Sequence, residues 1–272
     1  MRLGISASLR TDTASNWIED QKSLGCKSVV FPLNCEDDSQ RIEEFAQRAR
    51  ENDILIAEVG VWRNTLSADL TQRNRMIEYA VGQLALAEKI GARCCVNVVG
   101  TPHGPRWDGG YAANFDKDTR KQIVSMIRTI IDEVNPKITK YAVEPMPWMV
   151  PTGPDDYLRL MDEVERDGFG VHLDLINMVN SPQRYFNLNE FMDECFEKLG
   201  SRIESCHLKN IRLLEEFTFQ LKECACEDGV MDIARYLRHA TDVDEDMPMI
   251  IEHLDTDEEY RRSFEYVSNI GF

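Results

Sequence analysis

The sequence lacks the features of membrane, secreted and nucleic-acid-binding proteins. No apolar stretch reaches the ~20 residues of a membrane-spanning helix, and no signal-peptide core follows Met1. The 31 Lys and Arg residues are outnumbered by 48 Asp and Glu residues, which gives a net charge of −17, whereas binding to nucleic-acid phosphates needs clustered cations. We therefore expect a soluble cytoplasmic protein with neither a nucleic acid nor a membrane as partner.

The cysteines form no recognisable metal-binding or disulfide pattern. The eight residues are scattered, and Cys224 and Cys226 are separated by one residue rather than by the two of a CxxC pair. Disulfide frameworks are typical of small secreted chains, whereas this chain has 272 residues, of which 43% are hydrophobic. We expect reduced thiols with a mostly structural role.

Short β-rich runs alternate with amphipathic helical patterns along the whole chain, without a Gly/Ser linker or a low-complexity segment. Apolar residues in the helical patterns recur at three- and four-residue steps. Strands are expected at Leu3–Ala7, Ser28–Leu33, Ile54–Val61, Arg93–Val99, Tyr141–Met146, Gly170–Asp174, Ile203–His207 and Met249–Leu254. Helical patterns lie at Ser39–Asn52, Leu70–Ile90, Lys117–Val134, Asp155–Glu165, Asn189–Leu199, Ile233–Ala240 and Asp257–Val267.

Strict alternation of strands and helices favours parallel strands that are joined by helical crossovers. Eight such units in 272 residues is the number found in a closed barrel. A doubly wound sheet is the structural alternative, but its first turn is often a glycine-rich phosphate cradle, and the sequence contains neither G-x-G-x-x-G nor a P-loop. We predict an α/β fold, a (β/α)8 TIM barrel that forms a single domain over residues 1–272.

The fifth to eighth predicted strands each end with an isolated carboxylate or imidazole inside an apolar run. These residues are Glu144, Asp174, His207 and Glu252. Functional groups of such barrels lie at the carboxyl ends of the strands, and a buried charge is costly unless it is paired or bound to a cation. One divalent ion would satisfy all four, and this mixture of oxygen and nitrogen ligands suits Mn²⁺, Mg²⁺, Co²⁺ or Zn²⁺. The alternative is a set of ordinary salt bridges with Lys209, Arg63 or Arg106.

These segments resemble, in order and spacing, those of the xylose isomerase-like TIM barrels, a superfamily of sugar isomerases and epimerases that includes the ketose 3-epimerases. The resemblance covers essentially the whole chain. It rests on Val143-Glu144-Pro145, Val171-His172-Leu173-Asp174, Ser205-Cys206-His207-Leu208-Lys209 and Ile250-Ile251-Glu252-His253, with Trp107-Asp108-Gly109 matching a subgroup pattern. The resemblance implies one divalent metal ion, with Mn²⁺ expected first, that is held by Glu144, Asp174, His207 and Glu252. It also implies that Glu144 and Glu252 transfer protons on opposite faces of a carbohydrate substrate.

The expected reaction follows from such a metal site. A divalent ion chelated by a carbonyl and an adjacent hydroxyl acidifies the neighbouring C–H, a carboxylate removes the proton, and the ion stabilises the enediolate. Reprotonation then gives epimerisation or aldose–ketose isomerisation, and we predict a sugar isomerase or epimerase. A lyase or dehydratase acting on a keto-sugar, keto-inositol or 3-keto-glycoside is the first alternative. A non-catalytic carbohydrate-binding barrel is the second, and the charge of −17 argues against the nucleases of this fold.

Two single positions and one loop depart from the family pattern; the loop is Cys226-Glu227-Asp228-Gly229, where relatives often have P-G-x-G. Asn177 stands where ketose 3-epimerases usually have a substrate-holding His, and Asn210 replaces the Asp of an HxKD-like motif. The predicted metal ligands are therefore intact, whereas the residues that contact the substrate differ. This difference keeps the lyase alternative open.

Seven side chains near the strand ends are expected to contact the substrate. They are Lys209, Asn177, His172, Trp107, His103, Glu58 and Trp62. Lys209 shares a strand face with His207, so it holds either a substrate oxygen or one of the carboxylates. His172 is alternatively a donor to the metal ligands or a packed core residue.

Other residues bear on the shape and surroundings of the expected site. His103 and Trp107 lie in a loop of about a dozen residues, which is long enough for a lid or a pocket wall, and Trp62, Trp107 and Trp148 are candidate platforms for a sugar face. Glu58 alternatively anchors Arg63. His253 is expected to face away from the side of Glu252. No basic cluster calls for a phosphate, so we expect a neutral sugar, and the resemblance makes a homo-oligomer an expected state.

Overall fold

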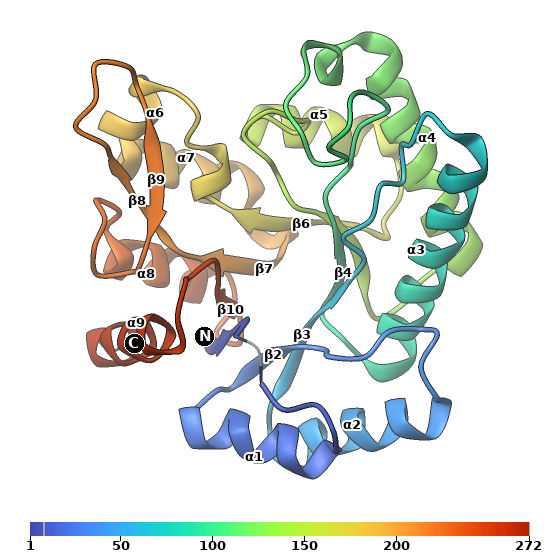
Figure 1. Cartoon of the computed structure of the whole chain (residues 1–272), viewed down its shortest axis with the longest axis vertical. Helices are drawn as coiled ribbons and strands as arrows, with labels where there is room; N and C mark the ends of the chain where they lie inside the picture. The colour runs from blue at the N-terminus through green and yellow to red at the C-terminus, as the bar shows by residue number, and fades with distance from the viewer. Residues whose placement is uncertain (8, 272) are drawn as a thin grey trace.

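The computed structural model of the protein describes residues 1–7 and 9–271. Eight parallel strands form one sheet in the order β1-β10-β7-β6-β5-β4-β3-β2, and the helices lie around the outside of these strands (Figure 1). The strands are β1 (Arg2–Ile5), β2 (Ser28–Val30), β3 (Leu55–Gly60), β4 (Cys94–Asn97), β5 (Lys140–Val143), β6 (Phe169–Asp174), β7 (Ile203–Leu208) and β10 (Pro248–Ile251). The predicted α/β barrel with eight parallel strands is confirmed.

The helices include all seven that the sequence predicted. They are α1 (Ala14–Leu24), α2 (Ser39–Glu51), α3 (Leu70–Ile90), α4 (Lys117–Val134), α5 (Pro154–Val164), α6 (Pro182–Phe186), α7 (Leu188–Leu199), α8 (Ile233–Val243) and α9 (Asp257–Ile270), with short 3-10 turns at Ala112–Phe115, Ile176–Met178 and Gly200–Arg202. No helix within the described ranges is long and apolar enough to cross a membrane. All eight cysteines are unpaired, and six of them are buried.

Local sequence signals define the ends of several helices. Asp38 and Asp69 accept hydrogen bonds from backbone N–H groups in the first turns of α2 and α3. Thr256 and Glu259 form a capping box at the start of α9. These side chains satisfy N–H groups that have no partner within the helix, so each helix begins at the residue that follows its cap.

Helices α1 and α6 and an antiparallel hairpin were not among the predicted elements. The hairpin pairs β8 (Asn210–Leu213) with β9 (Leu221–Cys224) after β7, and Figure 1 shows it beside α6. The buried face of α1 includes the polar Gln21, which weakens its apolar periodicity. The two hairpin strands are only four residues long and mix buried, partly buried and exposed residues without a regular alternation, so their sequence pattern is typical of a loop.

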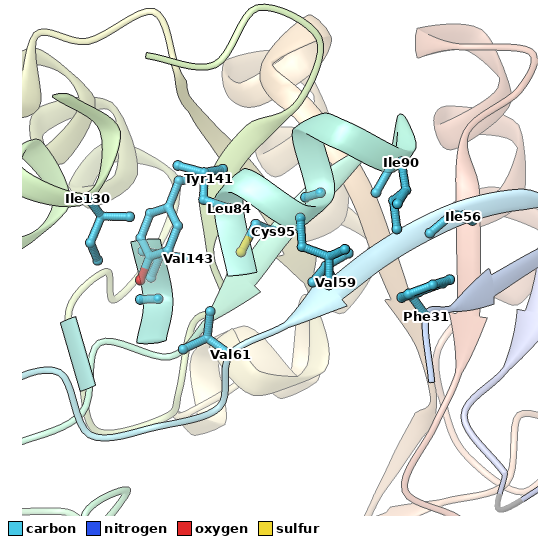
Figure 2. Packing of buried hydrophobic residues seen from close by; sticks show 14 of the residues in the cluster. Phe31, Ile56, Val59, Val61, Leu84, Ile90, Cys95, Ile130, Tyr141 and Val143 are labelled. Atoms are coloured by element: carbon cyan, nitrogen blue, oxygen red, sulfur yellow. The ribbon is translucent and has the colours of Figure 1, made fainter. Parts of the chain in front are cut away.

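Side chains alternate between the outside and the inside of the barrel, because successive residues of a strand point to opposite faces. The outward-facing residues pack against the helices. Figure 2 shows this packing for Val59 of β3, Cys95 of β4 and Tyr141 and Val143 of β5 near Leu84, Ile90 and Ile130 of the covering helices. The inward-facing Cys94, Val96 and Ala142 form a separate cluster of small side chains, which leaves space inside the barrel for polar groups.

The barrel is nearly closed where β1 meets β2. Two hydrogen bonds connect the chain at this point, from Lys27 N to Leu3 O and from Ser28 Oγ to Arg2 O, both at 2.7 Å. Gly4 permits this approach, because a Cβ atom at that position would lie 2.1 Å from the backbone oxygen of Ser28. The closure of the barrel therefore requires a residue without a side chain at position 4.

The substitution Gly4→Ala should lower the free energy of unfolding by about 1–3 kcal/mol, because it forces the backbones of β1 and β2 apart. Urea denaturation followed by circular dichroism measures the change. Gly170→Ala is the matched control, since the new Cβ would be 2.7 Å from the side-chain Cγ of Glu204 and 3.0 Å from Lys140 Cβ rather than against backbone. Equal losses for the two variants would contradict the proposed role of Gly4.

Candidate metal centre

Four buried side chains meet at the carboxyl ends of β5, β6, β7 and β10. They are Glu144, Asp174, His207 and Glu252, and one ligand atom from each lies within 4.8 Å of the others. His207 Nδ1 is 2.9 Å from Glu252 Oε2, 3.4 Å from Glu144 Oε1 and 3.9 Å from Asp174 Oδ2. The structure thus brings together the four residues that the sequence predicts as metal ligands.

The alternation of side chains places these four residues in one layer of the barrel interior. Strands β5, β6, β7 and β10 are consecutive neighbours in the sheet, and their registers pair Asp174 with His207. The outward-facing Val143, Leu173 and Ile251 lie one residue earlier and belong to the hydrophobic core. Consequently the ligand layer is fixed by the same register that buries the apolar residues between the barrel and the helices.

Lys209 supplies a buried positive charge beside this layer. Its Nζ lies 2.6 Å from Asp174 Oδ2, 2.6 Å from Glu252 Oε1 and 3.0 Å from Glu223 Oε1 of β9. Of the two roles considered for Lys209, the structure therefore shows the pairing with carboxylates. With His207 neutral, as a metal ligand must be, three carboxylates and one ammonium leave a formal charge of −2 in the layer, which is the charge that a divalent cation neutralises.

Burial and mutual interactions shift the pKa values of the layer. Burial raises the pKa of Asp174 to about 6, against the opposing effect of Lys209. Burial also disfavours the charged form of Glu252, but the neighbouring His207 and Lys209 outweigh it and hold the pKa well below its usual range. For His207, burial is outweighed by the carboxylates of Glu252, Glu58 and Glu144, which raise its pKa well above the ordinary value. The layer thus attracts positive charge strongly.

One atom of His207 is suited to a cation. Nδ1 faces the three carboxylates but makes no aligned hydrogen bond among the described residues, although it is buried. The other ring nitrogen, Nε2, lies 3.2 Å from Glu58 Oε2. A neutral imidazole nitrogen combined with carboxylate oxygens is a donor set that Mn²⁺, Mg²⁺ or Zn²⁺ accepts, so these four residues could hold such an ion.

A cavity of about 480 Å³ opens above the layer. Glu144, His207 and Glu252 line its floor, and Trp62 and Trp107 are among its walls. Trp62 donates from Nε1 to Glu144 Oε2 at 3.3 Å, and its backbone has a φ of 39°, an uncommon conformation for a bulky residue. Gly60 makes room for the indole, because a Cβ at that position would overlap the ring.

A groove of about 840 Å³ adjoins this cavity. Asp108, Met146 and His253 line both spaces, whereas Asn177 and Trp148 line only the groove. Asn177 donates from its backbone N to Asp174 Oδ1 at 2.9 Å and from Nδ2 to Glu144 Oε1 at 3.3 Å. Asn177 therefore contacts two of the candidate ligands as well as the groove.

The other predicted substrate contacts lie away from these two spaces. Glu58 and His172 are fully buried below the ligand layer, where His172 Nδ1 is 2.6 Å from Ser205 Oγ. His103 donates its backbone N–H to Thr101 Oγ1 and is not among the residues that line either space.

The loop that carries His103 and Trp107 is fastened to the barrel. Asn114 donates to Gly109 O at 3.0 Å and to Trp148 O at 3.1 Å, and Trp148 donates from Nε1 to Asp108 O at 2.7 Å. These bonds favour a fixed pocket wall over a free lid.

At two positions of the site the structure differs from the sequence-based prediction: the orientation of His253 was wrong, and Glu223 was missed. His253 was expected to face away from the side of Glu252, but this prediction is wrong, because β10 ends at Ile251 and His253 adopts a φ of 58°. Its Nδ1 lies 3.2 Å from Lys209 Nζ and 3.2 Å from Glu223 Oε2. Glu223 was not predicted, since its strand reads as a loop and no local motif marks it.

Comparisons with known proteins agree with this architecture. The profile of a family described as xylose isomerase-like TIM barrel matches residues 18–270. No curated protein has significant sequence similarity to the chain.

Similar solved structures share the fold at low sequence identity. A xylose isomerase-like TIM barrel protein from Mycobacterium smegmatis in complex with magnesium is 18% identical, with a TM-score of 0.70 over 97% of this chain and 90% of that one. A probable 3-DHS dehydratase from Bacillus anthracis is 13% identical, with a TM-score of 0.74 over 99% of both chains. A D-psicose 3-epimerase from Clostridium cellulolyticum is 12% identical, with a TM-score of 0.71 over 99% of this chain and 97% of that one.

Replacing Lys209 by Met should destabilise the protein by about 3–5 kcal/mol in the presence of a chelator, because Asp174 and Glu252 then remain buried without their ammonium partner. Urea denaturation in EDTA measures the loss. Lys198→Met is the control, since Lys198 is a surface residue that pairs with Asp155 and Glu194, and its loss should leave the denaturation midpoint nearly unchanged. Similar midpoints for both variants would refute the role of Lys209.

Proposed function

The chain belongs to the xylose isomerase-like TIM barrel family, and from this membership we propose that it is a divalent-metal-dependent sugar isomerase or epimerase, with Mn²⁺ as the expected ion. The observation that carries the proposal is the convergence of Glu144, Asp174, His207 and Glu252 in one buried layer below a cavity. The unpartnered Nδ1 of His207 and the formal charge of the layer support a divalent ion. The D-psicose 3-epimerase of the same fold supports a sugar substrate.

Two side chains of the layer are placed for proton transfer. Glu144 follows β5 and Glu252 follows β10, and both line the cavity. An ion held by the four ligands would polarise a substrate carbonyl and so acidify the adjacent C–H. Glu144 and Glu252 approach the cavity from strands that are three positions apart in the sheet order, so one carboxylate can remove a proton from one face of the substrate while the other returns a proton to the opposite face.

The remaining cavity residues position the substrate and limit contact with water. Trp62 and Trp107 offer apolar ring faces on the walls, which suit the C–H face of a sugar ring. Trp62 also donates a hydrogen bond to Glu144 and thereby fixes the orientation of that carboxylate. Asn177 fixes the same side chain from the groove side, so Glu144 enters the reaction in a defined geometry.

A lyase or dehydratase is the second candidate function, and Asn177 is the observation that favours it. An amide at this position can hold a carboxylate or a substrate oxygen but cannot exchange a proton with the substrate. The adjoining groove of about 840 Å³ gives space for a group that leaves the substrate. The probable 3-DHS dehydratase shares the fold, and a keto-sugar, keto-inositol or 3-keto-glycoside would be a suitable substrate.

Metal analysis of the purified protein after Mn²⁺ loading should find about one ion per chain, because the site offers one set of four ligands. The double variant Glu144→Gln/Glu252→Gln should lose this ion, since two of the three carboxylate ligands become neutral amides. Glu215→Gln/Glu216→Gln changes two exposed carboxylates of the hairpin by the same charge and should retain the ion. If neither the wild type nor the control holds a specific ion, the proposed mechanism fails.

Incubation of the Mn²⁺-loaded protein with a panel of ketoses, aldoses and keto-glycosides in D₂O should incorporate deuterium beside the carbonyl of the substrate. Glu144→Gln and Glu252→Gln should each reduce this exchange by at least about 100-fold, because each removes one acid–base group. Mass spectrometry and NMR measure the exchange and identify the product. Exchange without loss of a group indicates an isomerase or epimerase, release of a leaving group indicates a lyase, and metal binding without any exchange favours the non-catalytic barrel.

A further inference from the structure

A buried carboxylate lies directly below the candidate metal centre and is not needed for either its ligand set or its cavity. Glu58 of β3 has no solvent exposure, although an isolated buried carboxylate is costly. Its Oε2 lies 3.2 Å from His207 Nε2, and its Oε1 lies 3.5 Å from His172 Nδ1. Both contacts are with imidazoles inside the barrel.

The position of Glu58 in the barrel makes this contact specific. Strands β3 and β7 are four positions apart in the order of eight strands, so they lie on opposite sides of the barrel. The side chain of Glu58 therefore extends across the interior to reach His207. Small side chains leave space for it. Cys94 of β4 is the register partner of Glu58, and Ala142 of β5 belongs to the same buried cluster as Cys94.

The hydrogen bond defines which nitrogen of His207 remains available. A carboxylate only accepts hydrogen bonds, so its partner Nε2 carries a hydrogen. In the neutral ring that binds a metal ion, Nδ1 then presents its lone pair toward Glu144, Asp174 and Glu252. Carboxylates that bond the distal nitrogen of a metal-binding histidine orient the ring and increase its basicity.

His172 packs against one side of the His207 ring. Its ring lies edge-on to that of His207, with centroids 4.0 Å apart. Its Nδ1 is bonded to Ser205 Oγ at 2.6 Å, and Ser205 Oγ lies 3.1 Å from Cys94 Sγ. These contacts hold the His172 ring against that of His207.

We propose that Glu58 is a positioning residue of the metal centre: it fixes the ring orientation and the tautomer of His207, so that Nδ1 binds the divalent ion. This inference rests on the proposed function, because it requires a metal ion at His207. It assigns to Glu58 a role in metal affinity rather than the substrate contact that the sequence suggests.

A second metal ion held by Glu58, His172 and His207 is the main rival, since these side chains are also close together. The geometry disfavours it. The His172 nitrogen nearest to Glu58 is already bonded to Ser205. His207 Nε2, the nitrogen that such an ion would need, is bonded to Glu58.

The first test uses the wild-type protein labelled with ¹⁵N-histidine and loaded with Mg²⁺, which is diamagnetic. Two-bond ¹H–¹⁵N correlation spectra distinguish the two ring nitrogens. We expect a hydrogen on Nε2 of His207 and a shift of Nδ1 when Mg²⁺ is added. In the Mg²⁺-loaded protein, a hydrogen on Nδ1 of His207, or a metal-induced shift at Nε2 in place of Nδ1, overturns the proposal without the need for any variant.

The second test compares the Mn²⁺ affinity of the wild type, Glu58→Gln and Gln83→Leu by isothermal titration calorimetry. Gln retains the size of Glu58 but loses its charge, and the affinity should fall by about 10- to 100-fold. Gln83 is equally buried but contacts Cys35 and Gly60 instead of His207, so Gln83→Leu should bind Mn²⁺ like the wild type. Circular dichroism confirms that each variant is folded.

The outcomes separate this inference from the proposed function. No specific ion in the wild type refutes the proposed function and this inference with it. One ion per chain with equal affinity in the wild type and Glu58→Gln refutes only the role of Glu58. Two ions per chain, of which Glu58→Gln loses one, also overturn it in favour of a second metal site.

Discussion

The structure depends on the compensation of negative charge buried at the carboxyl ends of four neighbouring strands. Glu144, Asp174 and Glu252 are almost without solvent contact, and they share their layer with His207. Such a group of carboxylates is tolerated only where positive charge lies within the same layer. Lys209 provides one charge beside the carboxylates, and a divalent ion would provide the remainder. Positive charge beside these carboxylates is therefore required both for a stable barrel and for the proposed chemistry.

The register of the barrel connects this layer with the hydrophobic core. Residues one position before the ligands face the helices, and residues two positions before them face the interior, where His172 and Ser205 lie. A shift of one strand by one residue would turn a ligand toward the helices and an apolar side chain toward the cavity. The helices that cover β5, β6, β7 and β10 thus hold the candidate metal centre in place, although they contribute none of the four ligands.

The sequence alone was sufficient for the eight parallel strands and for the grouping of Glu144, Asp174, His207 and Glu252, because isolated charges at the ends of apolar runs are a local signal. Local patterns identify the face on which a residue lies but not the partner that it meets. For this reason the role of Lys209 stayed open between two alternatives. The contact between Glu58 and His207 joins residues 149 positions apart, and nothing in either segment marks it. His253 departed from strand alternation because the backbone turns there with a positive φ.

The arrangement around Glu144 bears on the choice between the two candidate reactions. Trp62 contacts one carboxylate oxygen from the cavity, and Asn177 contacts the other from the groove. Neither partner exchanges protons at neutral pH, so both reactions would use the same pair of carboxylates. The outcome then depends on where the second proton is delivered: to a carbon of the substrate, or to an oxygen that departs. Because the cavity and the groove meet at Asp108, Met146 and His253, a substrate that extends into the groove places its departing oxygen close to His253. A substrate confined to the cavity lies over Glu144 and Glu252, which would return the proton to carbon.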